Sequence, residues 1–199
     1  MIGPGDVQWM TAGAGILHEE FHSRVFSETG GVLQMVQLWV NLPASHKMAP
    51  AKYQALHGDV IPLVKLPNNA GTVRPIAGEF DGTAGPAHIH SPMQVWDIRL
   101  KAGGQTCFHL ADGWTGAVVV LEGTVCVNNS QQVTDGQMAL LSSANTEVKL
   151  HAEKPALVLI LSGEPLNEPV IGHGPFVMNS KSEILQAFDD LKHDRFGSL

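Results

Sequence analysis

A histidine and a glutamate two residues apart are the first side chains with a chemical use. They are His18 and Glu20, in the stretch Leu17-His18-Glu19-Glu20 of a chain with ten histidines and one tyrosine. In a β-strand, residues i and i+2 point to the same face about 7 Å apart. As a strand, this stretch would direct His18 and Glu20 at one metal ion, and one more imidazole would give a donor set suited to Fe(II). The alternative is an exposed strand end with solvated side chains.

Two other groups of potential ligands have simpler interpretations. His88-Ile89-His90 repeats the i, i+2 spacing, but the Gly-Pro-Ala before it and the Ser91-Pro92 after it favour an exposed loop. Cys107 and Cys126 form neither a disulfide framework nor a zinc cluster, so we expect both to pack in the core.

Length and charge exclude several classes of function. The 199 residues allow one large domain or two small ones. With 12 Lys and Arg against 19 Asp and Glu, the net charge of −7 excludes a basic surface for nucleic acid or an anionic membrane. The apolar runs are too short to span a bilayer, and no secretory signal opens the sequence. We therefore expect a cytoplasmic protein.

The spacing of glycine and proline indicates the elements that must position these side chains. They recur every ~8–12 residues between short apolar stretches, which is typical of an all-β fold. The stretch Leu42–Leu66, rich in Pro, Ala and Lys, reads as a linker, and Asn128-Asn129 reads as a turn. Strands are predicted over residues 32–42, 95–100, 117–127, 137–142 and 156–162, the third with a bend at 121–124.

Only the C-terminus has a helical period. Ser180 and Glu183 form a capping box, in which a serine and a glutamate three residues on satisfy the first N–H groups of a helix. The predicted apolar stripe of this helix consists of Ile184, Leu185, Phe188 and Leu191.

A short pattern occurs twice in the chain. Gly5-Asp6-Val7 leads to Leu17-His18-Glu19-Glu20, and Gly136-Gln137-Met138 leads to Leu150-His151-Ala152-Glu153. A repeated β unit predicts two related barrels. Two further strands precede only the second copy, so on this hypothesis the first barrel lacks its front half.

Longer motifs carry a family resemblance. They are Ile2-Gly3-Pro4-Gly5-Asp6-Val7-Gln8-Trp9-Met10-Thr11-Ala12-Gly13, Gln37-Leu38-Trp39-Val40-Asn41-Leu42-Pro43, Val120-Leu121-Glu122-Gly123, Gly163-Glu164-Pro165-Leu166 and Gly174-Pro175-Phe176-Val177-Met178-Asn179. With these motifs the chain resembles the pirin family of the cupin superfamily over almost its whole length. The resemblance implies an all-β bicupin of two cupin (double-stranded β-helix, or jelly-roll) barrels, here with an incomplete N-terminal barrel and a short C-terminal helix. The expected parts are residues 1–60, a barrel remnant plus linker, 61–170, the C-terminal barrel, and 171–199, a segment packing back on the N-terminal part.

The resemblance also implies a metal site. Members of the family hold one metal, usually iron, between a His-x-His pair and a later His and Glu two residues apart. His18 and Glu20 fall on the later pair, whereas the His-x-His pair would lie upstream of Met1. We therefore expect a truncated member in which Fe(II) or another divalent metal binds weakly or not at all. In the second barrel, His109, His151 and Glu153 fall on three of four cupin ligand positions, with Ala111 at the fourth, and form a hypothetical second site.

Two functions compete. The first is a non-enzymatic member, a binding or oligomeric module with a degraded metal site that forms a homodimer and takes a small aromatic ligand. The second is a quercetin 2,3-dioxygenase-like oxygenase whose site is completed by His22, His46 or His57, or by a partner chain. The first is favoured, because a metal held by two side chains binds weakly and exchanges with water.

Overall fold

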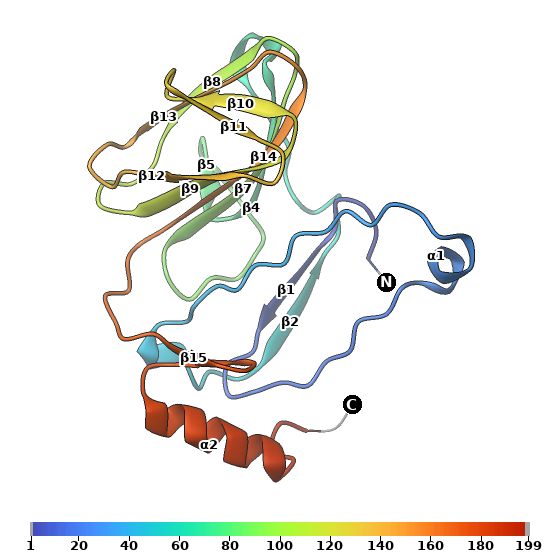
Figure 1. Cartoon of the computed structure of the whole chain (residues 1–199), viewed down its shortest axis with the longest axis vertical. Coiled ribbons are helices and arrows are strands. Elements are labelled where there is room, and N and C mark those ends of the chain that lie inside the picture. The colour runs from blue at the N-terminus through green and yellow to red at the C-terminus, as the bar shows by residue number, and fades with distance from the viewer. Residues whose placement is uncertain (1, 198–199) are drawn as a thin grey trace. The chain divides into compact units, whose positions relative to one another are not determined.

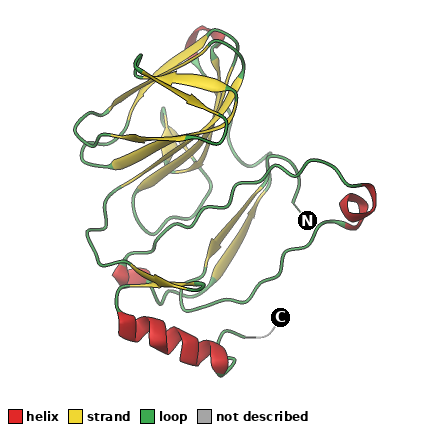
Figure 2. Cartoon of the chain, in the orientation of Figure 1, coloured by secondary structure: helices red, strands yellow, loops and turns green. Residues whose placement is uncertain are grey.

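The structure is a computed structural model that describes residues 2–197, drawn in Figure 1. The chain forms two compact units. The barrel unit comprises residues 4–7 and 56–165, and the mixed unit comprises the rest of the described chain. Figure 2 shows that strands dominate the first, whereas long irregular segments, strands and helices make up the second.

Two antiparallel sheets form the barrel unit. One has six strands in the order β12-β9-β14-β7-β4-β3, and the other has four in the order β11-β10-β13-β8. A hairpin of β5 and β6 and the 3₁₀ turn η2 (Pro67–Asn69) complete the unit. The strands are β3 (Val64–Lys65), β4 (Gly71–Ala77), β5 (Glu79–Phe80), β6 (Thr83–Ala84), β7 (Met93–Leu100), β8 (Gly104–His109), β9 (Thr115–Glu122), β10 (Thr124–Val127), β11 (Gln131–Thr134), β12 (Met138–Leu141), β13 (Glu147–Ala152) and β14 (Ala156–Gly163).

The core of the barrel unit follows from alternation along these strands, since every second side chain of a strand points to the same face. Trp96 is 2% exposed at the centre of an aromatic cluster. Its ring meets Phe80 and Phe108 edge to face, with centroids 4.9 and 5.4 Å away. The most buried aliphatic members are Val73, Ile98, Val118, Val120, Val125, Val133, Val148, Leu150, Val158 and Ile160.

An ion pair on the outer side of the six-stranded sheet anchors the segment 4–7. Arg74 on β4 lies directly opposite Asp97 on β7, and their side chains are only 12% and 11% exposed. Arg74 Nη1 donates to Asp97 Oδ2 over 3.2 Å, and Nη2 donates to the carbonyl oxygen of Gly5 over 2.5 Å. The next residue, Asp6, accepts the backbone N–H of Gly58 at 2.7 Å. Charged side chains therefore hold the Gly5-Asp6 motif to the barrel unit.

The mixed unit contains less regular structure. β1 (Val7–Thr11) pairs with β2 (Lys52–Leu56), and β15 (Ile171–His173) forms a hairpin with β16 (Phe176–Met178). Between β1 and β2 lie the short helix α1 (Arg24–Thr29) and the 3₁₀ turn η1 (Ala44–His46), and the chain ends in α2 (Lys181–Lys192). Within residues 2–197, no helix combines the length and the apolar character that crossing a bilayer requires.

The capping prediction for α2 is confirmed. Ser180 is the N-cap, and its hydroxyl accepts the backbone N–H of Glu183 at 3.3 Å. Ile184 is buried and Phe188 packs edge to face on Phe176 at 5.0 Å. The prediction that Leu185 belongs to the apolar stripe is wrong, because one residue advances about 100° around a helix and leaves this side chain 71% exposed. Ala187 takes the buried place instead.

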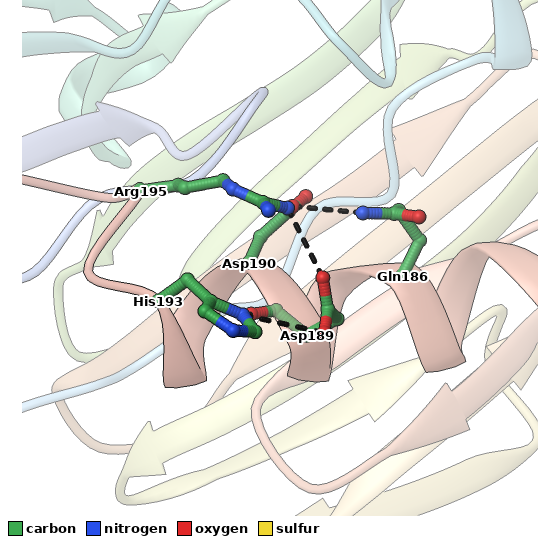
Figure 3. A network of polar contacts seen from close by, with 5 residues as sticks. All are labelled: Gln186, Asp189, Asp190, His193 and Arg195. Atoms are coloured by element: carbon green, nitrogen blue, oxygen red, sulfur yellow. Dashed lines mark hydrogen bonds and ion pairs between the residues drawn. The ribbon is translucent and has the colours of Figure 1, made fainter.

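A surface network surrounds the C-terminal end of α2 (Figure 3). Arg195 donates to Asp190 over 2.5 Å and to Asp189 over 3.1 Å, and Gln186 donates to Asp190 over 2.9 Å. His193 Nδ1 lies 3.3 Å from the Asp189 carboxylate. The hydrogen bond from Arg195 holds the pKa of Asp190 below its ordinary value. These contacts tie the turn after the helix to its last two turns.

Most strand predictions are confirmed in the barrel unit. Residues 95–100, 137–142 and 156–162 fall largely on β7, β12 and β14, while 117–127 divides into β9 and β10 at Gly123, where φ is 82°. The turn at Asn128-Asn129 is also present, with φ of 51° and 56°. Two predictions are wrong. Val32–Leu42 joins no sheet of the described chain, and the predicted linker Leu42–Leu66 contains both β2 and β3.

Candidate metal-ligand segment

His18 and Glu20 lie in the irregular segment between β1 and α1, and both side chains are exposed. The expectation that a strand directs them to one face is therefore wrong. A strand forms where its N–H and C=O groups pair with a neighbouring backbone, and residues 12–23 belong to none of the sheets within 2–197. Without that pairing, the i, i+2 spacing sets no common direction for the two side chains.

The substitute histidines engage other groups. The ring of His22 lies 5.1 Å from that of Phe26, and His46 Nδ1 lies 2.9 Å from the Ser45 hydroxyl. His57, in the barrel unit, has its Nδ1 3.2 Å from Asp6 Oδ2. Across residues 2–197, no three His, Cys, Asp or Glu side chains are grouped so that they could hold a metal ion. The donors present in the described chain therefore do not fit a resident mononuclear metal.

The hypothetical second site is contradicted by the direction of its side chains. Phe108 points into the core of the barrel unit, so its neighbour His109 points outward and is exposed. His151 follows the buried Leu150 in β13, so its side chain also points away from the core. In the pairing of β8 with β13, His109 of β8 lies opposite Glu147, and His151 of β13 lies opposite Gln105 of β8. The two histidines are therefore offset by four residues along the strands, which is about 13 Å at the rise of a strand.

A sequence signal for this orientation exists. Gln105, Cys107 and His109 are the polar residues at odd positions of β8, whereas Thr106 and Phe108 at even positions are buried. The alternation alone assigns His109 to the outer face.

The remaining candidate ligands take part in local contacts. His88 and His90 lie in the predicted loop, between β6 and β7, with ring centroids 5.0 Å apart. Cys107 is exposed, so its predicted place in the core is wrong, and Cys126 is half-buried. Desolvation of the thiol and its hydrogen bond to the Glu147 carboxylate, which lies 3.5 Å from Sγ, raise the pKa of Cys107. A raised pKa lowers the reactive thiolate fraction.

An exposed apolar run follows α1 in the chain. Val32–Val40 reads Val-Leu-Gln-Met-Val-Gln-Leu-Trp-Val, and every residue in it is exposed. Val32 is 93% exposed and Trp39 is 68% exposed. Monomeric proteins rarely leave large contiguous apolar surface in water, so this run is a candidate binding surface.

Comparison with known proteins agrees with the fold. The family model for the pirin C-terminal cupin domain matches residues 95–197, and the pirin model matches residues 1–40. A Pseudomonas aeruginosa protein whose name marks it as a candidate quercetin 2,3-dioxygenase is 54% identical over 195 residues, which cover 98% of this chain and 68% of that protein. Human pirin is 36% identical over 200 residues, covering 98% of this chain and 67% of its own length.

A solved structure gives the same result. The crystal structure of a quercetin 2,3-dioxygenase from Acinetobacter baumannii superposes with a TM-score of 0.95 at 49% identity. The match covers 99% of this chain and 68% of that one. The chain thus spans about two thirds of the length of these relatives.

Proposed function

This chain belongs to the pirin family of bicupins, and from that premise we propose that its 199 residues act as a non-enzymatic binding module rather than as a metal-dependent oxygenase. The observation that supports the proposal is the state of the His18–Glu20 segment. Both donors are exposed on irregular backbone, and the described chain brings no third donor to them. The exposed apolar run Val32–Val40 offers a binding surface in place of a reaction centre.

The energetics of metal binding support the same proposal. Affinity for a divalent metal depends on the number of protein donors and on how firmly surrounding contacts orient them. Two side chains on an irregular, solvated segment have neither advantage, because each must be ordered at the moment the metal binds. A metal at this place would exchange readily with water and would lack the fixed open position that oxygenase chemistry requires.

The second candidate is a quercetin 2,3-dioxygenase-like activity. The names of the Pseudomonas and Acinetobacter relatives and their 54% and 49% identity to this chain favour it. For this chain, the activity requires donors in addition to His18 and Glu20. These donors would have to come from outside residues 2–197, and a partner chain is one such source.

Turnover of quercetin separates the two candidates. With Fe(II) added anaerobically and oxygen then admitted, we expect the chain to cleave quercetin at least about 100-fold more slowly than the Acinetobacter enzyme, since even the loss of groups behind the ligands costs 10–100-fold. The decrease of flavonol absorbance measures the rate. A His18→Ala variant is the control and should show the same residual rate. Iron-dependent cleavage within tenfold of that enzyme, lost in His18→Ala, would overturn the proposal.

A further inference from the structure

The loop between β6 and β7 contains a second pair of donors at the spacing of His18 and Glu20. The pair consists of His88, which is exposed, and His90, which is half-buried, and both lie in the barrel unit. Their ring centroids are 5.0 Å apart, and the ring planes are nearly perpendicular, at 86°. The structure therefore brings two imidazoles together at an exposed place, which an i, i+2 spacing in a loop does not do by itself.

Backbone contacts hold this loop on both sides of the histidine pair. Before the pair, Ala87 is 8% exposed, and its N–H donates to the carbonyl oxygen of Ile76 on β4 over 3.0 Å. After the pair, the carbonyl oxygen of Pro92 accepts the N–H of Glu164 at 3.0 Å, and the proline ring fixes φ at this position. A loop held at both ends loses less conformational freedom when a ligand binds, so the two imidazoles are partly preorganised.

The separation of the two rings fits a shared metal ion. An ion held at about 2.1 Å from an imidazole nitrogen lies about 3.2 Å from the centroid of that ring. When each ring directs one nitrogen at the same ion, centroids 5.0 Å apart correspond to an angle of about 100° at the metal. Neighbouring ligands of octahedral and tetrahedral ions are separated by about 90° and about 109°. The separation of the two rings therefore matches two adjacent coordination positions.

The donors of the pair select the class of metal. Neutral imidazole suits Zn(II), Ni(II) and Cu(II), whereas Mg(II) and Ca(II) prefer oxygen ligands. Within residues 2–197, no group of three or more His, Cys, Asp or Glu includes this pair, so water would fill the other coordination positions. Both histidines also take part in other interactions within the chain, with which an ion competes. The pair therefore fits an ion that exchanges rather than a resident one.

We propose that His88 and His90 form a surface site for an exchangeable divalent transition metal, Zn(II) or Ni(II), bound by one nitrogen of each ring and by water. The site is built from the barrel unit alone and uses no residue of the His18–Glu20 segment, which belongs to the mixed unit. It goes beyond the proposed function, because a metal ion on this loop neither requires nor supplies an oxygenase centre. Since the ion exchanges with water, desalting removes it from the protein.

Isothermal titration calorimetry of the untagged chain with Ni(II), at about pH 8 where imidazole is neutral, tests the site. Ni(II) is the probe because, unlike Cu(II), it does not oxidise the exposed Cys107 thiol. We expect the tightest step to take up one ion per chain. His88→Ala and His90→Ala should each weaken this step at least about tenfold, since a chelating pair binds far more tightly than either donor alone. His173→Ala is the matched control, because His173 is also exposed and its ring has an aromatic neighbour at 5.5 Å, and this variant should bind as the wild type does.

Nuclear magnetic resonance of the wild-type chain gives a readout that needs no variant. Paramagnetic Ni(II), added below one equivalent, should broaden the ring signals of His88 and His90 before those of the other histidines. Three outcomes would overturn the inference: no Ni(II) uptake, uptake that both His88→Ala and His90→Ala leave unchanged, or earlier broadening of other histidines. Uptake lost in His18→Ala instead would count against the proposed function, so the variant that loses the ion distinguishes the failure of one claim from the failure of the other.

Discussion

Replacing Arg74 by methionine should lower the unfolding free energy of the barrel unit by about 3–5 kcal/mol, as removal of one partner from a buried ion pair does. The change leaves the Asp97 carboxylate buried without its 3.2 Å hydrogen bond and removes the donor to Gly5. Asp97 Oδ1 has no hydrogen bond of its own, and Arg99 lies 3.7 Å from it as a weaker ionic neighbour. Urea unfolding followed by circular dichroism measures the loss.

Two further variants distinguish charge burial from lost packing. The double variant Arg74→Met, Asp97→Leu removes both charges and should recover most of the stability, because an apolar pair of similar size substitutes well for a buried ion pair. Arg99→Gln changes a side chain that is 59% exposed and should cost less than about 1 kcal/mol. A double variant as unstable as Arg74→Met would contradict this account of the pair.

Trp96→Ala should cost the barrel unit about 3–5 kcal/mol, the range for removing a large buried aromatic side chain. Trp96 is 2% exposed and fixes the edge-to-face cluster with Phe80 and Phe108. Trp96→Phe should cost less than half as much, because it keeps a ring in the site and the indole Nε1 has no hydrogen-bond partner to lose. Equal losses in the two variants, measured in the same urea titrations, would contradict this account, because they would show that a phenyl ring does not replace the indole in the cluster.

Local sequence signals predicted the parts of the fold that local chemistry determines. The strands at 117–127 and 156–162 begin with continuous apolar runs, which predict the elements. These runs do not give the inward face, because neighbouring residues such as Val158, Leu159 and Ile160 are all buried. The cap at Ser180 depends on two residues three positions apart. The family motifs supply the bicupin class, which the 0.95 TM-score with the Acinetobacter structure confirms.

The candidate site could not be predicted in the same way. His18 and Glu20 would share a face only if another segment paired with theirs, and an i, i+2 spacing contains no information about that pairing. The same holds for Val32–Leu42, whose apolar residues favour a strand while its partner is undetermined by the sequence. His109 is different, since the alternation of β8 is sufficient to place it on the outer face.

The metal content of the purified chain tests the central claim most directly. The protein is incubated with excess Fe(II) or Ni(II), desalted, and analysed for bound metal beside a His18→Ala variant. Because two exposed donors hold a metal weakly, we expect below about 0.1 metal ion per chain for both proteins. One tightly bound ion per wild-type chain, absent from His18→Ala, would contradict the account and favour the oxygenase.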